Sequence, residues 1–241
     1  MLFVGDTIRD EYHYVRPIGK AIKESAISVM FESSQTFYGG VWAAQSHLKS
    51  FCKHVDYMGG PNTMVNIRLV ENIYLRKLFV IHRMEANADR KDPHDFGWYD
   101  LVVVTDFGHG TMTKELIERI TQRAKFLAVN TQTNSTNYGF NLITKYPLAD
   151  LVVLDELEAR LAVHDRDSPI EDVIRKIARM AYKRIMVTLG VNGAIGFDGA
   201  FERQTAMTDK VIDSMGAGDA FLAVTSPYAA AGASMKDLIR I

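Results

Sequence analysis

Short apolar runs alternate along this chain with stretches whose apolar residues recur at helical spacing. The runs at 101–104 and 151–154 are continuous, which is typical of strands buried on both faces, and the segment 113–124 between them is amphipathic. Repeated units of strand, helix and strand predict an α/β fold with a mostly parallel central sheet and helices on both faces. The other elements expected are strands at 2–4, 126–129 and 184–188, helices at 41–52, 156–163, 169–182 and 218–232, and a hairpin of 194–197 with 201–206.

Two segments break this alternation. Residues 11–38, between the first strand and the first helix, hold apolar side chains in partial alternation with polar ones, and residues 67–81 are also strand-like. Alternation of this kind predicts strands with one exposed face. We expect these strands to form a small β lid over the site; an ordinary surface hairpin is the alternative.

Composition is that of an ordinary globular domain. The chain has 241 residues, of which 47% are hydrophobic and 24% are charged, so we expect one large domain over 1–241, or one domain with a small appendage. A formal net charge of −1 creates no overall field that attracts nucleic acid or an anionic membrane, and we expect neither as a partner. The single cysteine, the lack of a signal-peptide pattern and the lack of an apolar run near the roughly 20 residues of a membrane span predict a cytoplasmic protein.

The last residues have the pattern of a helix without a partner. Ser234–Asp237 resembles a capping box that opens a helix shortly after Gly232. Leu238, Ile239 and Ile241 then supply apolar side chains with no downstream segment to pack on. We therefore expect the natural domain to continue past residue 241.

The clearest candidate site lies at the start of the last long helix. Gly216, Ala217 and Gly218 allow the backbone to approach a ligand closely, and the helix N-terminus offers unpaired N–H groups to a phosphate. Asp219 stands where such an anion would lie, although a carboxylate repels phosphate. A base that takes a proton from an attacking hydroxyl explains its presence. An aspartate that merely caps the helix after a glycine turn is the alternative.

Several motifs follow one another in the order found in a known enzyme family. Residues 213–219 read Asp-Ser-Met-Gly-Ala-Gly-Asp, and segments 5–12, 38–40, 106–110 and 188–193 add motifs with glycine or aspartate. Segment 23–29, Lys-Glu-Ser-Ala-Ile-Ser-Val, adds the pattern of a lid strand. This set resembles the ribokinase-like (PfkB) family of carbohydrate kinases, whose signature is Asp-x-Thr-Gly-Ala-Gly-Asp. Met215 stands in the place of the usual Thr or Ser. The chain is most similar to the heptose-phosphate kinase domain of bifunctional heptose kinase/nucleotidyltransferase proteins.

The resemblance implies an ATP-dependent phosphotransferase of ribokinase-like fold that uses ATP and Mg²⁺ and acts on a sugar or sugar phosphate, with a heptose phosphate as one option. It also implies that the lid can form a homodimer, as in relatives. The implied residues are Asp219, Gly216, Ala217 and Gly218 for catalysis; Asp6, Asp10, Gly39, Gly40 and Asp106 for substrate binding; Thr188, Gly190, Gly193 and Asp213 for nucleotide binding; and Asp155 and Glu158 for magnesium.

Most of these residues also have an ordinary structural interpretation. Asp6 is equally typical of a turn after a strand, and the glycine pair 39–40 of a turn before a helix. The glycines within 190–193 also fit a simple turn. Asp155 and Glu158 place negative charge in a first helical turn, which the helix dipole favours without any metal.

The acceptor side departs from the family pattern. The segment 41–45 lacks the asparagine expected after the two glycines, His109 replaces a lysine, and Asn130-Thr-Gln132 replaces Asp-Pro-Lys. Two functions therefore stay open: a kinase with a different acceptor, or a non-catalytic module that binds nucleotide or sugar. A dinucleotide-dependent oxidoreductase would need Gly-x-Gly-x-x-Gly after the first strand, and residues 5–7 do not supply it.

Overall fold

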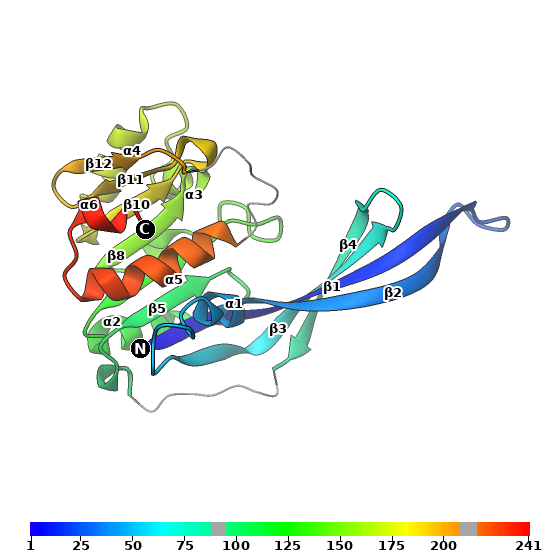
Figure 1. The fold of residues 1–241 in the computed structure, drawn as a ribbon, viewed down its shortest axis with the longest axis horizontal. Coiled ribbons are helices and arrows are strands. Elements are labelled where there is room, and N and C mark those ends of the chain that lie inside the picture. The colour runs from blue at the N-terminus through cyan, green and yellow to red at the C-terminus, as the bar shows by residue number, and fades with distance from the viewer. Residues whose placement is uncertain (88–94, 208–215) are drawn as a thin grey trace.

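The computed structural model describes residues 1–87, 95–207 and 216–241. Within them, one sheet of ten strands crosses the molecule (Figure 1). Its strands are β1 (Leu2–Lys20), β2 (Ile27–Gly40), β3 (Asp56–Glu71), β4 (Arg76–Ala86), β5 (Val102–Asp106), β6 (Leu127–Thr131), β8 (Leu151–Asp155), β10 (Ile185–Thr188), β11 (Ala194–Phe197) and β12 (Phe201–Gln204). They lie in the order β12-β11-β10-β8-β6-β5-β1-β3-β4, with β2 also paired to β1. Neighbours from β10 to β3 are parallel, so the predicted sheet is confirmed.

Helices cover both faces of the parallel strands, as the apolar runs predict. The helices are α1 (Val41–Ser46), α2 (Lys114–Arg123), α3 (Glu156–Ala162), α4 (Ile170–Ile177), α5 (Ala217–Ala230) and α6 (Met235–Leu238), with 3₁₀ turns at Phe96–Trp98, Ile143–Lys145 and Gly190–Asn192. Val102 and Val104 pack with the apolar side chains of α2, α3 and α4, whereas Val103 packs with those of α1, α5 and α6. Alternate residues of one strand therefore serve two cores.

No helix in the described ranges is both long enough and apolar enough to span a bilayer.

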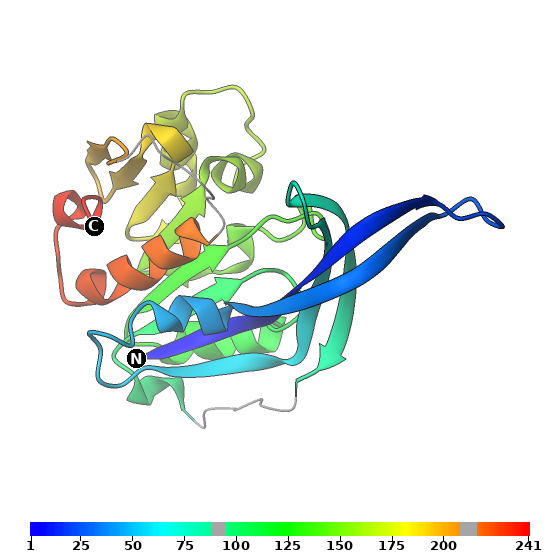
Figure 2. The ribbon, with the colours of Figure 1, turned by 45° about the vertical axis from the view of Figure 1, so that its right-hand side comes forward.

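Four strands of the sheet extend away from the rest of the molecule as an arm (Figures 1 and 2). We define the arm as residues 8–39 of the β1–β2 ribbon and residues 62–86 of the β3–β4 hairpin. The expectation that the first strand ends at residue 4 is wrong. β1 continues to Lys20 because β2 and β3 pair with its two edges along most of its length. The strand-like segment 67–81 comprises the end of β3, a turn and the start of β4.

Two helices are shorter than their patterns predict. α1 ends at Ser46, where tight turns follow and the N–H of Leu48 bonds to the carbonyl of Gln45. α4 ends at Ile177, and the residues expected to continue it form the short strand β9 (Ala181–Tyr182), which pairs with β7 (Leu148–Ala149). In both places, local backbone pairing replaces the last turns of the helix.

β1 changes its partner at Asp6, pairing with β5 before this residue and with β2 after it. The Asp6 side chain is buried, and its carboxylate accepts backbone N–H bonds from Phe107, His109 and Thr111 at 2.9, 3.2 and 3.1 Å. These bonds tie the loop after β5 to the point where the arm begins. Gly40 belongs to the same junction, since a Cβ there would lie 2.2 Å from the carbonyl oxygen of Asp6.

We expect the Asp6→Asn substitution to lower the free energy of unfolding by about 1–3 kcal/mol, because an amide would turn an N–H group toward converging backbone donors. Urea unfolding measures this change. Asp198→Asn, at the exposed turn between β11 and β12, is the matched control. Equal stability of the two variants would contradict the anchoring role of Asp6.

Candidate active site

Two cavities lie near the carboxyl ends of the parallel strands, the edge at which ligands bind in such sheets. The first, of about 520 Å³, lies beneath the arm, and we call it the arm cavity. The second, of about 640 Å³, lies between β8, β10 and β11 on one side and α5 and the chain end on the other; we call it the C-terminal cavity. The predicted residues lining the arm cavity are Asp10, Gly39, Gly40, Gly216 and Asp219. Those lining the C-terminal cavity are Asp155, Glu158, Thr188, Gly190, Gly193, Ala217 and Gly218.

One predicted residue, Asp213, lies outside the described residues.

The first turn of α5 separates the two cavities. Gly216 and Asp219 line the arm cavity, and Ala217 and Gly218 line the C-terminal cavity. Gly216 precedes the helix with φ of 79° and ψ of −2°, a left-handed conformation that glycine adopts without strain. A group bound at this helix N-terminus is therefore within reach of ligands in both cavities.

Asp219 is the carboxylate at this turn. It is only 6% exposed, and burial raises its pKa to about 7. Its Oδ1 accepts a hydrogen bond of 2.8 Å from Nε2 of Gln132, which follows β6. A carboxylate with a pKa near neutrality is suited to accept a proton at physiological pH.

A cluster of polar side chains from the arm lines the arm cavity. Oδ1 of Asp10 accepts from Nε and Nη2 of Arg68 at 2.9 and 2.7 Å, and from Nδ2 of Asn66 at 3.1 Å. Nδ1 of His82 lies 2.8 Å from Oδ1 of Asn66. The guanidinium of Arg68 therefore balances the charge of Asp10, and the second oxygen of Asp10 is the one able to accept from a ligand.

Two predicted substrate-binding residues lie away from the cavity surface. Asp6 and Asp106 are each only 1% exposed. The carboxylate of Asp106 accepts hydrogen bonds from the Tyr146 hydroxyl at 2.6 Å and from the N–H of Gly108 at 3.0 Å, and it forms an ion pair with Nζ of Lys145 at 2.5 Å. Protein donors thus satisfy both carboxylates. Asp6 and Asp106 therefore help to build the loop after β5, and their contact with substrate stays a prediction.

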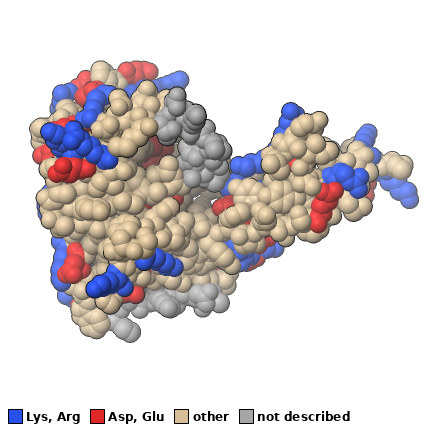
Figure 3. All heavy atoms as spheres, in the orientation of Figure 1, with Lys and Arg blue, Asp and Glu red and all other residues tan. Residues whose placement is uncertain are grey.

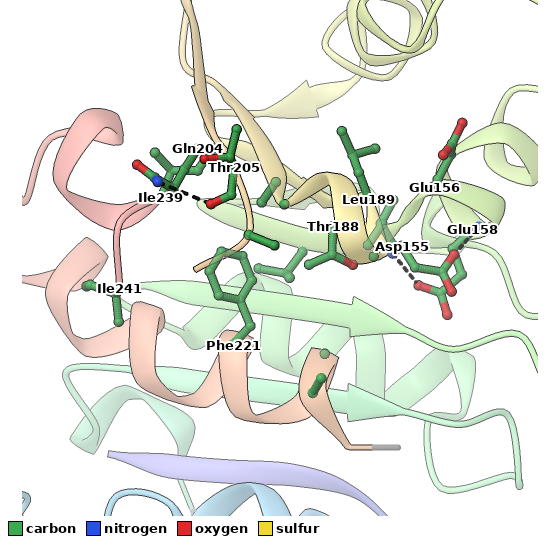
Figure 4. Close-up of a pocket in the computed structure, with 18 of the residues that line it drawn as sticks. Asp155, Glu156, Glu158, Thr188, Leu189, Gln204, Thr205, Phe221, Ile239 and Ile241 are labelled. Atoms are coloured by element: carbon green, nitrogen blue, oxygen red, sulfur yellow. Dashed lines mark hydrogen bonds between the residues drawn. The ribbon is translucent and has the colours of Figure 1, made fainter. Parts of the chain in front are cut away.

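The C-terminal cavity has an apolar end and an acidic end (Figure 4). Phe221, Ile239 and Ile241 surround one end, whereas Asp155 and Glu158 lie at the other. This arrangement fits an elongated ligand that has a flat apolar group at one end and a cation at the other.

Asp155 and Glu158 form a capping box at the start of α3. Oδ1 of Asp155 accepts from the N–H of Glu158 at 2.7 Å, and Oε2 of Glu158 accepts from the N–H of Asp155 at 2.8 Å. Burial, and then the charge of Asp155, raise the pKa of Glu158 to about 8. In the described part of the chain, no three His, Cys, Asp or Glu side chains gather as a metal site. The pair suits a magnesium ion held mostly by water and ligand oxygens, which is how Mg²⁺ usually binds.

Sequence reasoning missed four polar residues of the arm cavity. Asn66 and Arg68 are two positions apart on β3 and therefore share a face, but only the register with β1 brings them to Asp10. His82 joins them because it lies opposite Asn66 on β4. Gln132 follows β6, and the sequence signal that marks it is its place in the segment that replaces the Asp-Pro-Lys of the family pattern.

Comparisons with known proteins identify the family of the chain. Residues 52–241 match the model of the pfkB family of carbohydrate kinases. The chain is 31% identical to the bifunctional protein HldE of Desulfatibacillum aliphaticivorans over 57% of its own length and 29% of that protein. It is 29% identical to fructoselysine 6-kinase of Escherichia coli strain K12, over 70% of its length and 61% of that protein. The chain thus spans less than two thirds of these relatives.

Solved structures share the fold at low sequence identity. Arabidopsis thaliana ribokinase complexed with ribose and ATP has a TM-score of 0.67 and 13% identity, over 99% of this chain and 88% of that one. Escherichia coli phosphofructokinase-2 in complex with substrates and products has a TM-score of 0.68 and 14% identity, over 99% of this chain and 89% of that one. Because the family model matches most of the length of the chain, the chain belongs to the pfkB family of carbohydrate kinases.

Proposed function

We propose that this chain transfers the terminal phosphoryl group of ATP to a hydroxyl of a sugar or sugar phosphate. The observation that carries this proposal is the first turn of α5, which has the arm cavity on one side and the C-terminal cavity on the other. A donor and an acceptor bound in these cavities would meet at a helix N-terminus. Its unpaired N–H groups favour the negative charge of a phosphoryl group in transit.

Asp219 would be the general base of this reaction. It lines the acceptor side of the turn and is buried, so its raised pKa suits it to take the proton of an attacking hydroxyl. Gly216, Ala217 and Gly218 would hold the phosphoryl oxygens through backbone N–H groups, since no side chain larger than a methyl group stands in the way.

ATP would lie in the C-terminal cavity, with Thr188, Gly190 and Gly193 along its side. Asp155 and Glu158 would hold magnesium at the acidic end, partly through water, where the ion would neutralise phosphate charge. The place of these two carboxyl groups supports this assignment, because Glu158 is buried beside Asp155 and a nearby cation would offset the repulsion between them. The nucleotide contact expected for Asp213 stays a prediction.

The acceptor would bind in the arm cavity beneath a lid formed by the arm. The second oxygen of Asp10 would accept from a sugar hydroxyl, and Gly39 leaves room beside it. Heptose phosphates belong in the acceptor panel because the motifs resemble those of heptose-phosphate kinases, and fructoselysine belongs there because one relative carries the name fructoselysine 6-kinase. A cytoplasmic location, where ATP is available, stays a prediction.

The Asp219→Asn substitution should lower kcat by at least about 100-fold with Mg-ATP and any accepted sugar, because the base can no longer take a proton. A coupled assay over a panel of sugars and sugar phosphates measures this. Equal rates for the two proteins would contradict the catalytic assignment. Calorimetry with ATP covers the alternative function: tight binding by a wild-type chain that phosphorylates no acceptor would identify a non-catalytic binding module.

The pH dependence of kcat/KM should report the same base. Because Asp219 must be deprotonated to act and burial raises its pKa to about 7, kcat/KM should fall about tenfold per pH unit below that value. Glu158→Gln should keep this acid limb, since Asp219 is unchanged in it. A flat profile between about pH 5 and 8 would show that the proton goes elsewhere.

We further propose that a second copy of the chain covers the outer face of the arm, opposite the arm cavity. Phe31, Phe79 and Ile81 are exposed by 56, 52 and 47%. The pairs Leu69–Phe79 and Ile67–Ile81 place the last two on one face of the hairpin. Phe31 reaches this face through its edge contact with His13, which lies opposite Leu69. On the face of the arm seen in Figure 3, charged side chains are separated by uncharged surface. The exposed Phe31, Phe79 and Ile81 supply the apolar part of the proposed contact.

Light scattering tests this proposal. The wild-type chain should have twice the 27.1 kDa mass of one copy, and the double variant Phe31→Glu/Phe79→Glu should have the mass of one, because buried carboxylates oppose the contact. Phe51→Glu is the control, since Phe51 is 51% exposed but lies outside the arm. A monomeric wild-type chain would refute the dimer.

A further inference from the structure

We propose that Gln132 is a positioning residue for Asp219: its side-chain amide holds one carboxylate oxygen and leaves the other facing the acceptor. This inference rests on the proposed function, because it assumes that Asp219 is the base. The sequence names Gln132 only as a departure from the family pattern, where it stands in the place of a lysine, and assigns it no role.

The hydrogen bond itself is the first argument. Nε2 of Gln132 donates to Oδ1 of Asp219 at 2.8 Å, and both residues line the arm cavity. Across the described residues, this amide is the one donor that reaches the Asp219 carboxylate. Since a single oxygen is engaged, the other stays available to a hydroxyl, and rotation of the carboxylate is restricted.

The second argument is that the backbone of Gln132 is itself fixed. Its N–H donates to the carbonyl of Asp106 at 2.8 Å, and its carbonyl accepts from Nδ2 of Asn137 and of Asn141 at 3.3 and 3.2 Å. Asn141 is buried and also bonds to the carbonyl of Asp106 at 2.8 Å. A side chain that leaves a fixed backbone can hold its partner within the narrow limits that catalysis requires.

The third argument is the residue that follows. The N–H of Thr133 donates to Oε1 of Glu158 at 3.1 Å. Consecutive residues therefore hold a carboxylate of the arm cavity and a carboxylate of the C-terminal cavity. This short segment after β6 sets the distance between the groups assigned to the acceptor and to the donor.

The chemical type of the residue fits a positioning role. An amide supplies an N–H donor without a charge, whereas a cation at this distance would hold the base in its ionised form and weaken it as a proton acceptor. A hydrocarbon side chain would fill the same volume and supply no donor. Gln132 therefore orients Asp219 and leaves its affinity for a proton high.

Steady-state kinetics of Gln132→Met test the proposal, with an acceptor that the wild-type enzyme phosphorylates. Methionine has a similar length and no N–H donor. We expect kcat to fall about tenfold or more while KM for ATP and for the acceptor stay within about twofold, because a misplaced base affects the transition state and not binding. Gln122→Met, at an exposed position of α2, is the matched control.

Two kinetic results would overturn the proposal. A kcat equal to that of Gln122→Met would show that the bond has no catalytic effect. A lower KM for the acceptor with unchanged kcat would show that the amide occupies the place of the acceptor hydroxyl and must leave first. If Gln132→Met does not fold, Gln132→Asn replaces it, because the shorter side chain keeps the amide but cannot reach Asp219.

A spectroscopic measurement tests the bond without turnover. The side-chain amide signal of Gln132, identified by its loss in Gln132→Met or Gln132→Asn, should shift in Asp219→Ala. An unshifted signal would refute the bond. If the wild-type chain phosphorylates no acceptor, the proposed function fails, whereas this signal still decides whether Gln132 holds Asp219.

Discussion

The buried carboxylate of Asp6 is the interaction on which both the arm and the site depend. A buried ionised group is costly unless it is compensated, and three backbone N–H groups of the loop after β5 compensate this one. These three hydrogen bonds hold β1 at the point where it leaves the central sheet and begins the arm. It also fixes the loop that carries Phe107 and His109, which line the arm cavity. The fold and the cavity wall therefore share one anchor.

Charge is concentrated at the opposite side of the site, around the first turn of α5. Glu158 has a raised pKa because it is buried beside Asp155 and, more weakly, feels Asp219, whose own pKa is raised by burial. These carboxylates repel one another in a site that also has to admit phosphate. The positive end of α5 offsets part of that repulsion, and a cation that enters with the nucleotide would offset more. The arrangement thus favours a ligand that brings its own positive charge.

The sequence predicted the parts of the molecule that local patterns determine. Continuous apolar runs identified β5 and β8, and the glycine turn before Asp219 identified the start of α5. It did not predict the length of β1, because pairing with β2 and β3 on its two sides is a tertiary effect. The sequence also could not show that Asp6 and Asp10 have different surroundings. Both are aspartates on the first strand, and only the fold shows that one is covered by a loop while the other faces a cavity.

The difference between local patterns and tertiary pairing explains why the sequence predicts the proposed donor side more readily than the acceptor side. Backbone conformation dominates the turn at Gly216 and the turn that ends at Gly193, where φ is 85° and a Cβ would lie 1.9 Å from the carbonyl oxygen of Gln204. Such positions demand glycine and leave a mark in the sequence. The acceptor wall instead depends on the register of β1 with β3, which brings Arg68 to Asp10. A slip of one residue would turn such side chains to the opposite face. In the proposed function, acceptor choice would therefore depend on strand register, which no single motif records.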